Sequence, residues 1–141
     1  MDAFDADVLI YAAVADHEFG RRVRALFPVE AVKGSRAGIG SVLLIPELLT
    51  KPLRENATDE VLELSALLGR LHLLHTEEAT AELATALGAA YGLRAVDAVH
   101  LATAVGAGAD RFVTNNRSDF PQSITEIQVT YPDELSETAD T

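Results

Sequence analysis

The sequence predicts an α/β fold in which one central parallel sheet lies between two layers of helices, a three-layer α/β/α sandwich. Short apolar stretches alternate with longer amphipathic ones along the 141 residues, a pattern typical of parallel sheets that helices cover on both faces. Three acidic residues, Asp5, Glu47 and Asp97, have apolar neighbours in three separate segments. Because parallel sheets bind ligands beyond the carboxyl ends of their strands, we expect these three carboxylates to meet at one edge of the sheet.

Composition indicates a single folded domain. Hydrophobic residues make up 48% of the chain and charged residues 23%, which is ordinary for a globular protein of this length. We expect one domain over residues 1–135. The acidic C-terminal segment, residues 136–141, is predicted to form a tail that frays from this domain.

The sequence contains no cysteine and no long apolar run, which excludes several classes of protein. Without cysteine there is no disulfide and no thiolate metal site, so any metal would be held by oxygen or histidine. No apolar run approaches the roughly 18 residues that a membrane span requires. We therefore expect a cytoplasmic protein that does not associate with membranes.

The net charge of −11 argues against general binding of nucleic acid through a basic surface. Asp and Glu outnumber Lys and Arg by 22 to 11, whereas sequence-independent binding requires clustered cations. A nuclease is still compatible with this charge, because an acidic metal site contributes part of it. The only dense basic group, which could hold phosphate, consists of Arg21, Arg22 and Arg24.

The first quarter of the chain is predicted to contain two strands and two helices. Residues 3–11 read as a buried strand that runs into a helix, with Asp5 and Asp7 at the junction. We interpret Asp7 as the N-cap of that helix, a position that Asp favours, and Asp5 as a candidate ligand. Residues 17–27 form an amphipathic helix, and a short strand is expected around residues 37–39.

Two further helices and a strand are predicted in the middle of the chain. Ser41 caps a helix in which Pro46 should kink or terminate the regular hydrogen bonding. In that helix Glu47 has apolar neighbours on both sides; read alone, it would be an exposed helix residue. Thr58 caps the next helix, and the sequence LHLLH after it indicates a strand whose two histidines face opposite sides.

The segment from residue 93 to residue 120 is the part around which the chain is organised. Thr76 caps a helix that ends at Gly92, and a helix that is apolar nearly all round then carries Asp97 in its first turn. Read alone, Asp97 would be a charge that the helix dipole favours. A short strand and a polar loop follow, and the last strand is expected near residues 124–129.

Carboxylates without cysteine or well-placed histidine suit a hard divalent cation. Mg²⁺ and Mn²⁺ bind through a few oxygen ligands and retain several waters. Such a site can activate a water and stabilise the charge that develops during phosphodiester cleavage. The residues therefore indicate metal-assisted hydrolysis.

Three motifs together resemble those of the PIN-domain family. The opening DADVLIY resembles the family's D-x-[NSD]-[VI]-[LI], and IPELL resembles its internal glutamate segment. VDAVHLATAVGAGADRFVTNNRSDF resembles its D-A-x-x-x-A-T-A helix with the strand and T-N-D-x-D-F loop that follow. The resemblance covers residues 3–120 in order, and its motifs are individually weak but jointly specific.

This resemblance implies a compact α/β/α domain and a Mg²⁺-dependent endoribonuclease, with Mn²⁺ as an alternative cation. Small members of the family are mostly toxins of toxin–antitoxin pairs. The resemblance therefore implies an RNA substrate, a cognate antitoxin protein and a homodimer. The acidic site would consist of Asp5, Glu47 and Asp97, with Asp5 and Asp97 as metal ligands and Thr114 in support.

The chain departs from the family pattern at one position. Asn116 stands where the loop often has a fourth aspartate, which leaves Asp119 as the acidic residue of the loop. An amide oxygen can coordinate a cation, but it brings no charge and cannot act as a base. His100, three residues after Asp97, could hydrogen-bond that carboxylate; the alternative is a core histidine.

Two other functions compete with the nuclease. A phosphatase of the haloacid-dehalogenase type also has D-x-D after a strand, but Lys33 and Lys51 lie in poor contexts for its lysine and the late acidic pair is missing. The more serious alternative is a catalytically weakened or inactive PIN-like module that binds RNA or protein. Asn116 and the acidic charge favour that alternative.

Overall fold

The computed structural model of the protein describes residues 1–28 and 35–137. All strand pairings are parallel, and the strand order is β3-β2-β1-β4-β5. The strands are β1 (Asp2–Phe4), β2 (Gly38–Ser41), β3 (Leu71–Leu74), β4 (Arg111–Val113) and β5 (Gln128–Thr130). The helices are α1 (Ala6–Ala12), α2 (Glu18–Arg24), α3 (Leu44–Arg54), α4 (Thr58–Leu68), α5 (Glu78–Tyr91), α6 (Ala95–Gly106) and the 3₁₀ helix η1 (Pro132–Glu134).

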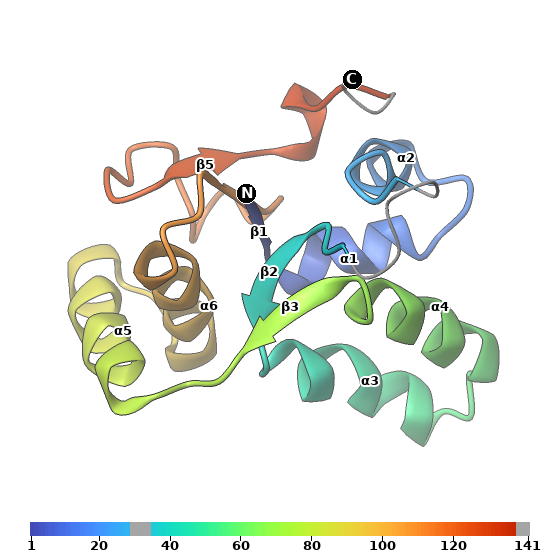
Figure 1. The fold of residues 1–141 in the computed structure, drawn as a ribbon, viewed down its shortest axis with the longest axis horizontal. Helices are drawn as coiled ribbons and strands as arrows, with labels where there is room; N and C mark the ends of the chain where they lie inside the picture. The colour runs from blue at the N-terminus through green and yellow to red at the C-terminus, as the bar shows by residue number, and fades with distance from the viewer. Residues whose placement is uncertain (29–34, 138–141) are drawn as a thin grey trace.

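Helices cover both faces of the sheet, which confirms the predicted three-layer sandwich. Helices α5 and α6 pack together on one face, and α1, α3 and α4 lie on the other (Figure 1). Helix α2 packs on α1 and contacts η1 near the C-terminal end. None of the helices in the described part of the chain is long and apolar enough to cross a membrane.

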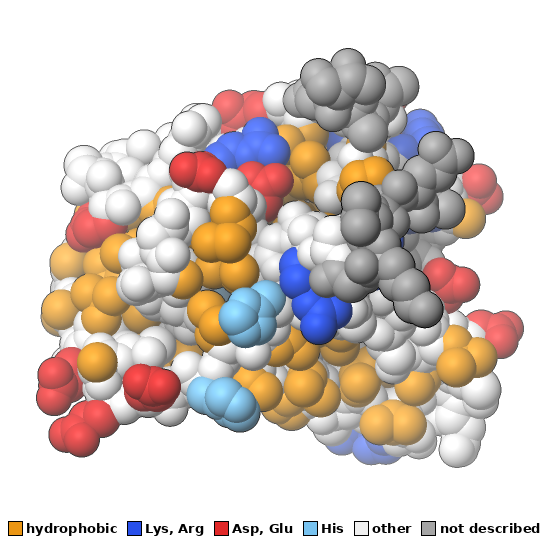
Figure 2. Space-filling model, viewed as in Figure 1, with side chains coloured by type: hydrophobic (Ala, Val, Ile, Leu, Met, Phe, Trp, Pro, Cys, Tyr) orange, Lys and Arg blue, Asp and Glu red, His pale blue; other side chains and the backbone are white. Residues whose placement is uncertain are grey.

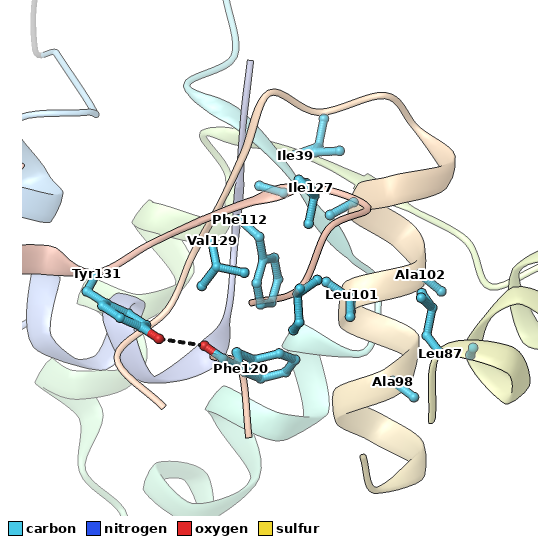
Figure 3. Packing of buried hydrophobic residues seen from close by; sticks show 14 residues of the cluster. Ile39, Leu87, Ala98, Leu101, Ala102, Phe112, Phe120, Ile127, Val129 and Tyr131 are labelled. Atoms are coloured by element: carbon cyan, nitrogen blue, oxygen red, sulfur yellow. Dashed lines mark hydrogen bonds between the residues drawn. The ribbon is translucent and has the colours of Figure 1, made fainter. Parts of the chain in front are cut away.

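The alternation of strand side chains divides the core into two clusters. Phe112 and Val129 point toward α6, where Leu101 belongs to the same cluster, while Ala98 lies on the side of α6 that faces Leu87 of α5 (Figure 3). The neighbouring strand residues Phe4 and Val113 point to the opposite face and pack with α1, α3 and α4. This period of two follows from the pleat of the strands. The loop after β4 is anchored by Phe120, whose carbonyl accepts a hydrogen bond from the Tyr131 hydroxyl at 2.8 Å.

Several helix starts differ from those predicted. Asp5, not Asp7, is the N-cap of α1, because its extended backbone (φ −83°, ψ 165°) lets its carboxylate accept from Ala6 N–H. Ser41 belongs to β2, and α3 begins three residues later. Helices α4 and α5 have Ala57 and Glu77 at the N-cap instead of threonines. The last strand begins at Gln128 rather than near residue 124, and Ile124 and Ile127 are buried in the core in the loop before it.

Pro46 does not interrupt α3. It is the third residue of the helix, and the N–H groups of the first turn have no partner within a helix. The missing N–H of a proline costs nothing at such a position. The predicted kink is therefore absent, and Glu47 lies in a continuous helix.

Part of two predicted segments cannot be compared with the structure. Of the loop before β2, residues 29–34 lie outside the described residues, as do residues 138–141 of the predicted acidic tail.

Candidate active site

Asp5 occupies the point where the two central strands end. It directly follows β1, and its backbone N–H donates to the carbonyl of Val113 at the end of β4, 3.0 Å away. The residue Asp5 is only 4% exposed. Its carboxylate accepts hydrogen bonds of 2.8 Å from Ala6 N–H and from the Thr114 hydroxyl. Each carboxylate oxygen keeps a further lone pair, so Asp5 is held in one orientation and can still bind a ligand.

Burial raises the pKa of Asp5 above its ordinary value. The loss of hydration is the largest cause, and the negative charge of Asp97 adds to it. The hydrogen bonds from Thr114 and Ala6 oppose the increase. A positive charge bound beside Asp5 would stabilise its ionised form.

Asp97, on α6, lies at the same edge of the sheet as Asp5. It lies in the first turn of α6 and is half-buried. Burial raises the pKa of Asp97, and the charges of Asp119 and Glu47 raise it further. Asp97 in turn acts on Asp5. The structure therefore brings together the four predicted acidic residues, which repel one another.

Glu47 is joined to the core by a histidine. His100 Nε2 lies 2.5 Å from Glu47 Oε2, and the His100 side chain is fully buried whereas that of Glu47 is 35% exposed. Of the two possibilities considered for His100, a bond to Asp97 is absent and the histidine is buried in the core, with its ring pointing across to α3. Its Nδ1 is buried and has no hydrogen-bond partner among the described residues. His100 thus fixes α3 against α6 and sets the position of Glu47.

Asn116 organises the loop after β4. Its side-chain amide donates to Asp119 Oδ2 at 2.9 Å, and its Oδ1 accepts from Ser118 and from Asp119 N–H. Thr114 Oγ1 accepts a hydrogen bond from Asn116 N–H at 3.1 Å. An ionised aspartate at position 116 has no hydrogen to donate to Asp119. Asn116 therefore orients the acidic residue of this loop.

Asp7 is a neighbour of the site that the sequence interpretation missed. Its Oδ2 accepts from Asn115 N–H at 3.0 Å, while its Oδ1 is buried without a partner among the described residues. Burial, and next the charge of Asp5, raise the pKa of Asp7 to about 7. The sequence did contain a signal for Asp7. Asp5 and Asp7 are two residues apart where a strand leads into a helix, so Asp7 lies in the first helical turn, close to Asp5.

An open cleft of about 580 Å³ adjoins the acidic residues. Its walls come from the start of α3 and the start of α6. Leu43, Pro46 and Val96 supply apolar surface, while Glu47, Asp97 and Arg94 supply charge. Arg94 is exposed, and its charge lowers the pKa of Asp97. The cleft gives solvent access to Glu47 and Asp97, whereas Asp5 and Asp119 do not line it.

The residues of this site fit a hard divalent cation that keeps much of its water. The donors are carboxylate oxygens whose mutual repulsion a cation would relieve. Across residues 1–28 and 35–137, no three Asp, Glu or His side chains are close enough together to enclose a metal ion. Mg²⁺ needs no such cage, because it usually binds through one or two carboxylates and waters.

Comparison with known proteins agrees with this geometry. The family model for the PIN domain matches residues 3–122 of the chain. The chain belongs to the PIN-domain family. Proteins of this family are generally nucleases and typically use divalent metal ions.

A solved structure has the same fold. It is described as a toxin–antitoxin complex from Klebsiella pneumoniae and shares 22% identity with this chain at a TM-score of 0.69. The alignment covers 94% of this PIN-domain chain and 98% of the other. No curated protein matches the sequence.

Proposed function

We propose that this PIN-domain protein is a Mg²⁺-dependent endoribonuclease that acts as the toxin of a toxin–antitoxin pair in the cytoplasm. The observation that carries the proposal is the gathering of Asp5, Glu47, Asp97 and Asp119 where β1 and β4 end, beside an open cleft. Mn²⁺ is the alternative cation, since it accepts the same oxygen ligands.

Each residue of the site has a distinct part in this proposal. Asp5 and Asp97 would hold the cation, which would activate a water and stabilise the charge that develops on the phosphodiester. Thr114 fixes the Asp5 carboxylate by its hydrogen bond. Asn116 orients Asp119, and Glu47, fixed by His100, forms the wall of the cleft opposite Asp97.

The proposal that this protein is a toxin is supported by the likeness of its fold, over nearly the whole chain, to that of a solved structure. The structural neighbour that covers nearly all of it is a chain of a toxin–antitoxin complex. By that likeness, we propose a cognate antitoxin protein that silences this chain by binding it.

A homodimer is the proposed state of the free protein. Ile45, Leu49 and Leu53 are spaced by four along α3, so they share one flank of the helix. Ile45 is 39% exposed and Leu53 59%, and Leu62 on the adjacent α4 is 63% exposed. Apolar residues that gather on a surface in this way usually mark an interface.

The experiment that tests the proposal is RNA cleavage with controlled metal. The purified protein is incubated with labelled single-stranded RNA in Mg²⁺, in Mn²⁺ and in EDTA. We expect internal cleavage with either metal and none in EDTA. Cleavage at equal rate in EDTA, or no cleavage with both metals, contradicts the proposal.

A PIN-like module that binds RNA or protein without cutting is the second candidate. The observation that favours it is Asn116, which supplies no charge where a fourth carboxylate would strengthen the metal site. This candidate predicts RNA or protein binding without cleavage at any metal concentration.

A further inference from the structure

The basic residues of this acidic chain divide into two groups. The chain has eleven Lys and Arg residues, ten of them in the described segments. Seven of those ten bond to the protein's own carbonyls or carboxylates. These seven are Arg21, Arg22, Arg24, Arg36, Arg70, Arg111 and Arg117.

The arginines of α2, which the sequence indicated for holding phosphate, belong to this bonded group. Arg21 donates to the carbonyl of Asp16 and Arg24 to that of Ala15. Arg22 donates to the carbonyl of Leu135 at 2.6 Å. Their hydrogen-bonding groups serve the fold, which leaves fewer of them for a ligand.

The remaining three cations lie beside the cleft or on the flank of α3 that leads away from it. Lys51, Arg54 and Arg94 make no hydrogen bond or ion pair within residues 1–28 and 35–137, and all three are exposed. Arg94 lines the cleft beside Asp97. Lys51 and Arg54 follow Glu47 by four and seven residues, so the three side chains share one flank of α3.

The flank formed by Lys51 and Arg54 extends away from the cleft. At a rise of about 1.5 Å per residue, these cations lie about 6 and 10 Å beyond Glu47 along the helix axis. The flank is separate from the apolar one formed by Ile45, Leu49 and Leu53. In Figure 2, basic side chains occupy isolated spots among acidic and apolar ones, including the lower edge over α3.

We propose that Lys51, Arg54 and Arg94 form the binding track for the sugar–phosphate backbone of single-stranded RNA. The inference rests on the proposed nuclease function and names the path of its substrate. The strand lies along the Lys51–Arg54 flank, passes Glu47 and Asp97 in the cleft and continues past Arg94. The apolar walls at Leu43, Pro46 and Val96 face the bases.

The availability of N–H donors favours this path over other parts of the described surface. At a net charge of −11, most of the surface repels a polyanion, so binding requires cations that can contact phosphate directly. Among the described basic residues, only the three above make no hydrogen bond or ion pair with the protein itself, whereas Arg21 and Arg24 keep their charge but already donate to carbonyls. An RNA strand on this track also places a phosphodiester beside the proposed cation.

The test measures RNA binding in EDTA, so that cleavage does not enter. A labelled single-stranded RNA is titrated with the protein by fluorescence anisotropy between about 50 and 200 mM monovalent salt. The Lys51→Gln/Arg54→Gln variant is compared with Arg21→Gln/Arg24→Gln, which removes the same charge from α2. Thermal melts establish that each variant is folded.

For single strands, each phosphate contact contributes about 0.7 to the slope of log Kobs against log salt concentration. We expect the α3 variant to lose about 1.4 from the magnitude of that slope, and an Arg94→Gln variant to lose about 0.7. The α2 variant should keep the slope of the unsubstituted protein. Equal losses in the α2 and α3 variants, an unchanged slope in the α3 variant, or no RNA binding by the unsubstituted protein overturns the proposal.

Failure of the inference and failure of the proposed function give different results. RNA binding with the expected slopes but without cleavage in Mg²⁺ or Mn²⁺ supports the proposed binding track and contradicts the proposed nuclease activity. Metal-dependent cleavage with an unchanged slope in the α3 variant leaves the nuclease and removes the track.

Discussion

Asp7 provides a quantitative test of the electrostatics of the site. In the folded protein its pKa is raised from 3.8 to about 7, by burial first and by the charge of Asp5 next. The folded state therefore binds more protons than the unfolded state between these two values. The free energy of unfolding must fall as the pH rises through this range, and the loss is complete above pH 7.

The Asp7→Asn substitution removes this dependence. A shift of about 3 pKa units corresponds to about 4 kcal/mol at most, since each unit is worth about 1.4 kcal/mol. Asn keeps an oxygen that can accept from Asn115 N–H and carries no charge at any pH. Partial solvation of the half-buried Asp7 side chain lowers the expected gain to about 2 to 4 kcal/mol above pH 7, with none near pH 4.

The assay is chemical denaturation in EDTA at a series of pH values. The quantity of interest is the difference in unfolding free energy between Asp7→Asn and the unsubstituted protein, because contributions that Asp7 does not affect cancel in it and the coupling of Asp7 to Asp5 remains. Glu63→Gln on the exposed side of α4 is the matched control and should change stability by less than about 0.5 kcal/mol at every pH. A difference for Asp7→Asn that stays flat between pH 4 and 8 would refute the reasoning.

Three further predictions follow from the contacts of the site. His100→Leu removes the bond to Glu47, so it should lower the free energy of unfolding by roughly 1.5 to 3 kcal/mol in denaturation assays and reduce RNA cleavage. His100→Gln retains a hydrogen-bond donor and should recover part of both the stability and the cleavage. Asn116→Asp should lower the melting temperature in EDTA, because two carboxylates then adjoin, yet tighten Mg²⁺ binding in calorimetry at pH 7.5; unchanged affinity would mean that Asp119 already suffices. Leu53→Asp should convert the proposed dimer to a monomer in sedimentation, and an unsubstituted protein that is monomeric at micromolar concentration would contradict the dimer.

The broad arrangement of the fold was predictable because it depends on local patterns. Alternating strand and helix patterns require a parallel sheet with helices on both faces, and the structure has it. The carboxyl ends of the strands then meet at one edge. Asp5 and the loop that begins at Thr114 lie beside each other at that edge, where the Thr114 hydroxyl donates to the Asp5 carboxylate.

Side-chain pairings across elements were not predictable from spacing. His100 is three residues from Asp97 in the sequence, but the packing of α6 against the sheet turns its ring toward Glu47 of α3. Glu47 and His100 are 53 positions apart, so their pairing depends on how the helices pack in the tertiary structure. The spacing of residues along one helix cannot predict such a pairing. The hydrogen bonds of Asn116 could not be predicted either, because its partners within the loop come together only once the turn is formed.

Helix caps were missed for a local reason. Ser41, Thr58 and Thr76 are residues that favour the N-cap, but their backbones belong to a strand, a first turn and a loop. The backbone path sets which residue occupies the cap, and neighbouring elements set that path.

The most direct test of the metal-dependent nuclease is the cleavage rate of Asp97→Asn. Asp97 lies in the cleft and is coupled to the other acidic residues. Replacing its charge should lower single-turnover RNA cleavage in saturating Mg²⁺ by on the order of 100-fold or more. The variant should remain folded and melt at a higher temperature than the parent in EDTA, because a repelling carboxylate is gone. If Asp97→Asn cuts RNA as fast as the parent, the acidic cluster is not the active site.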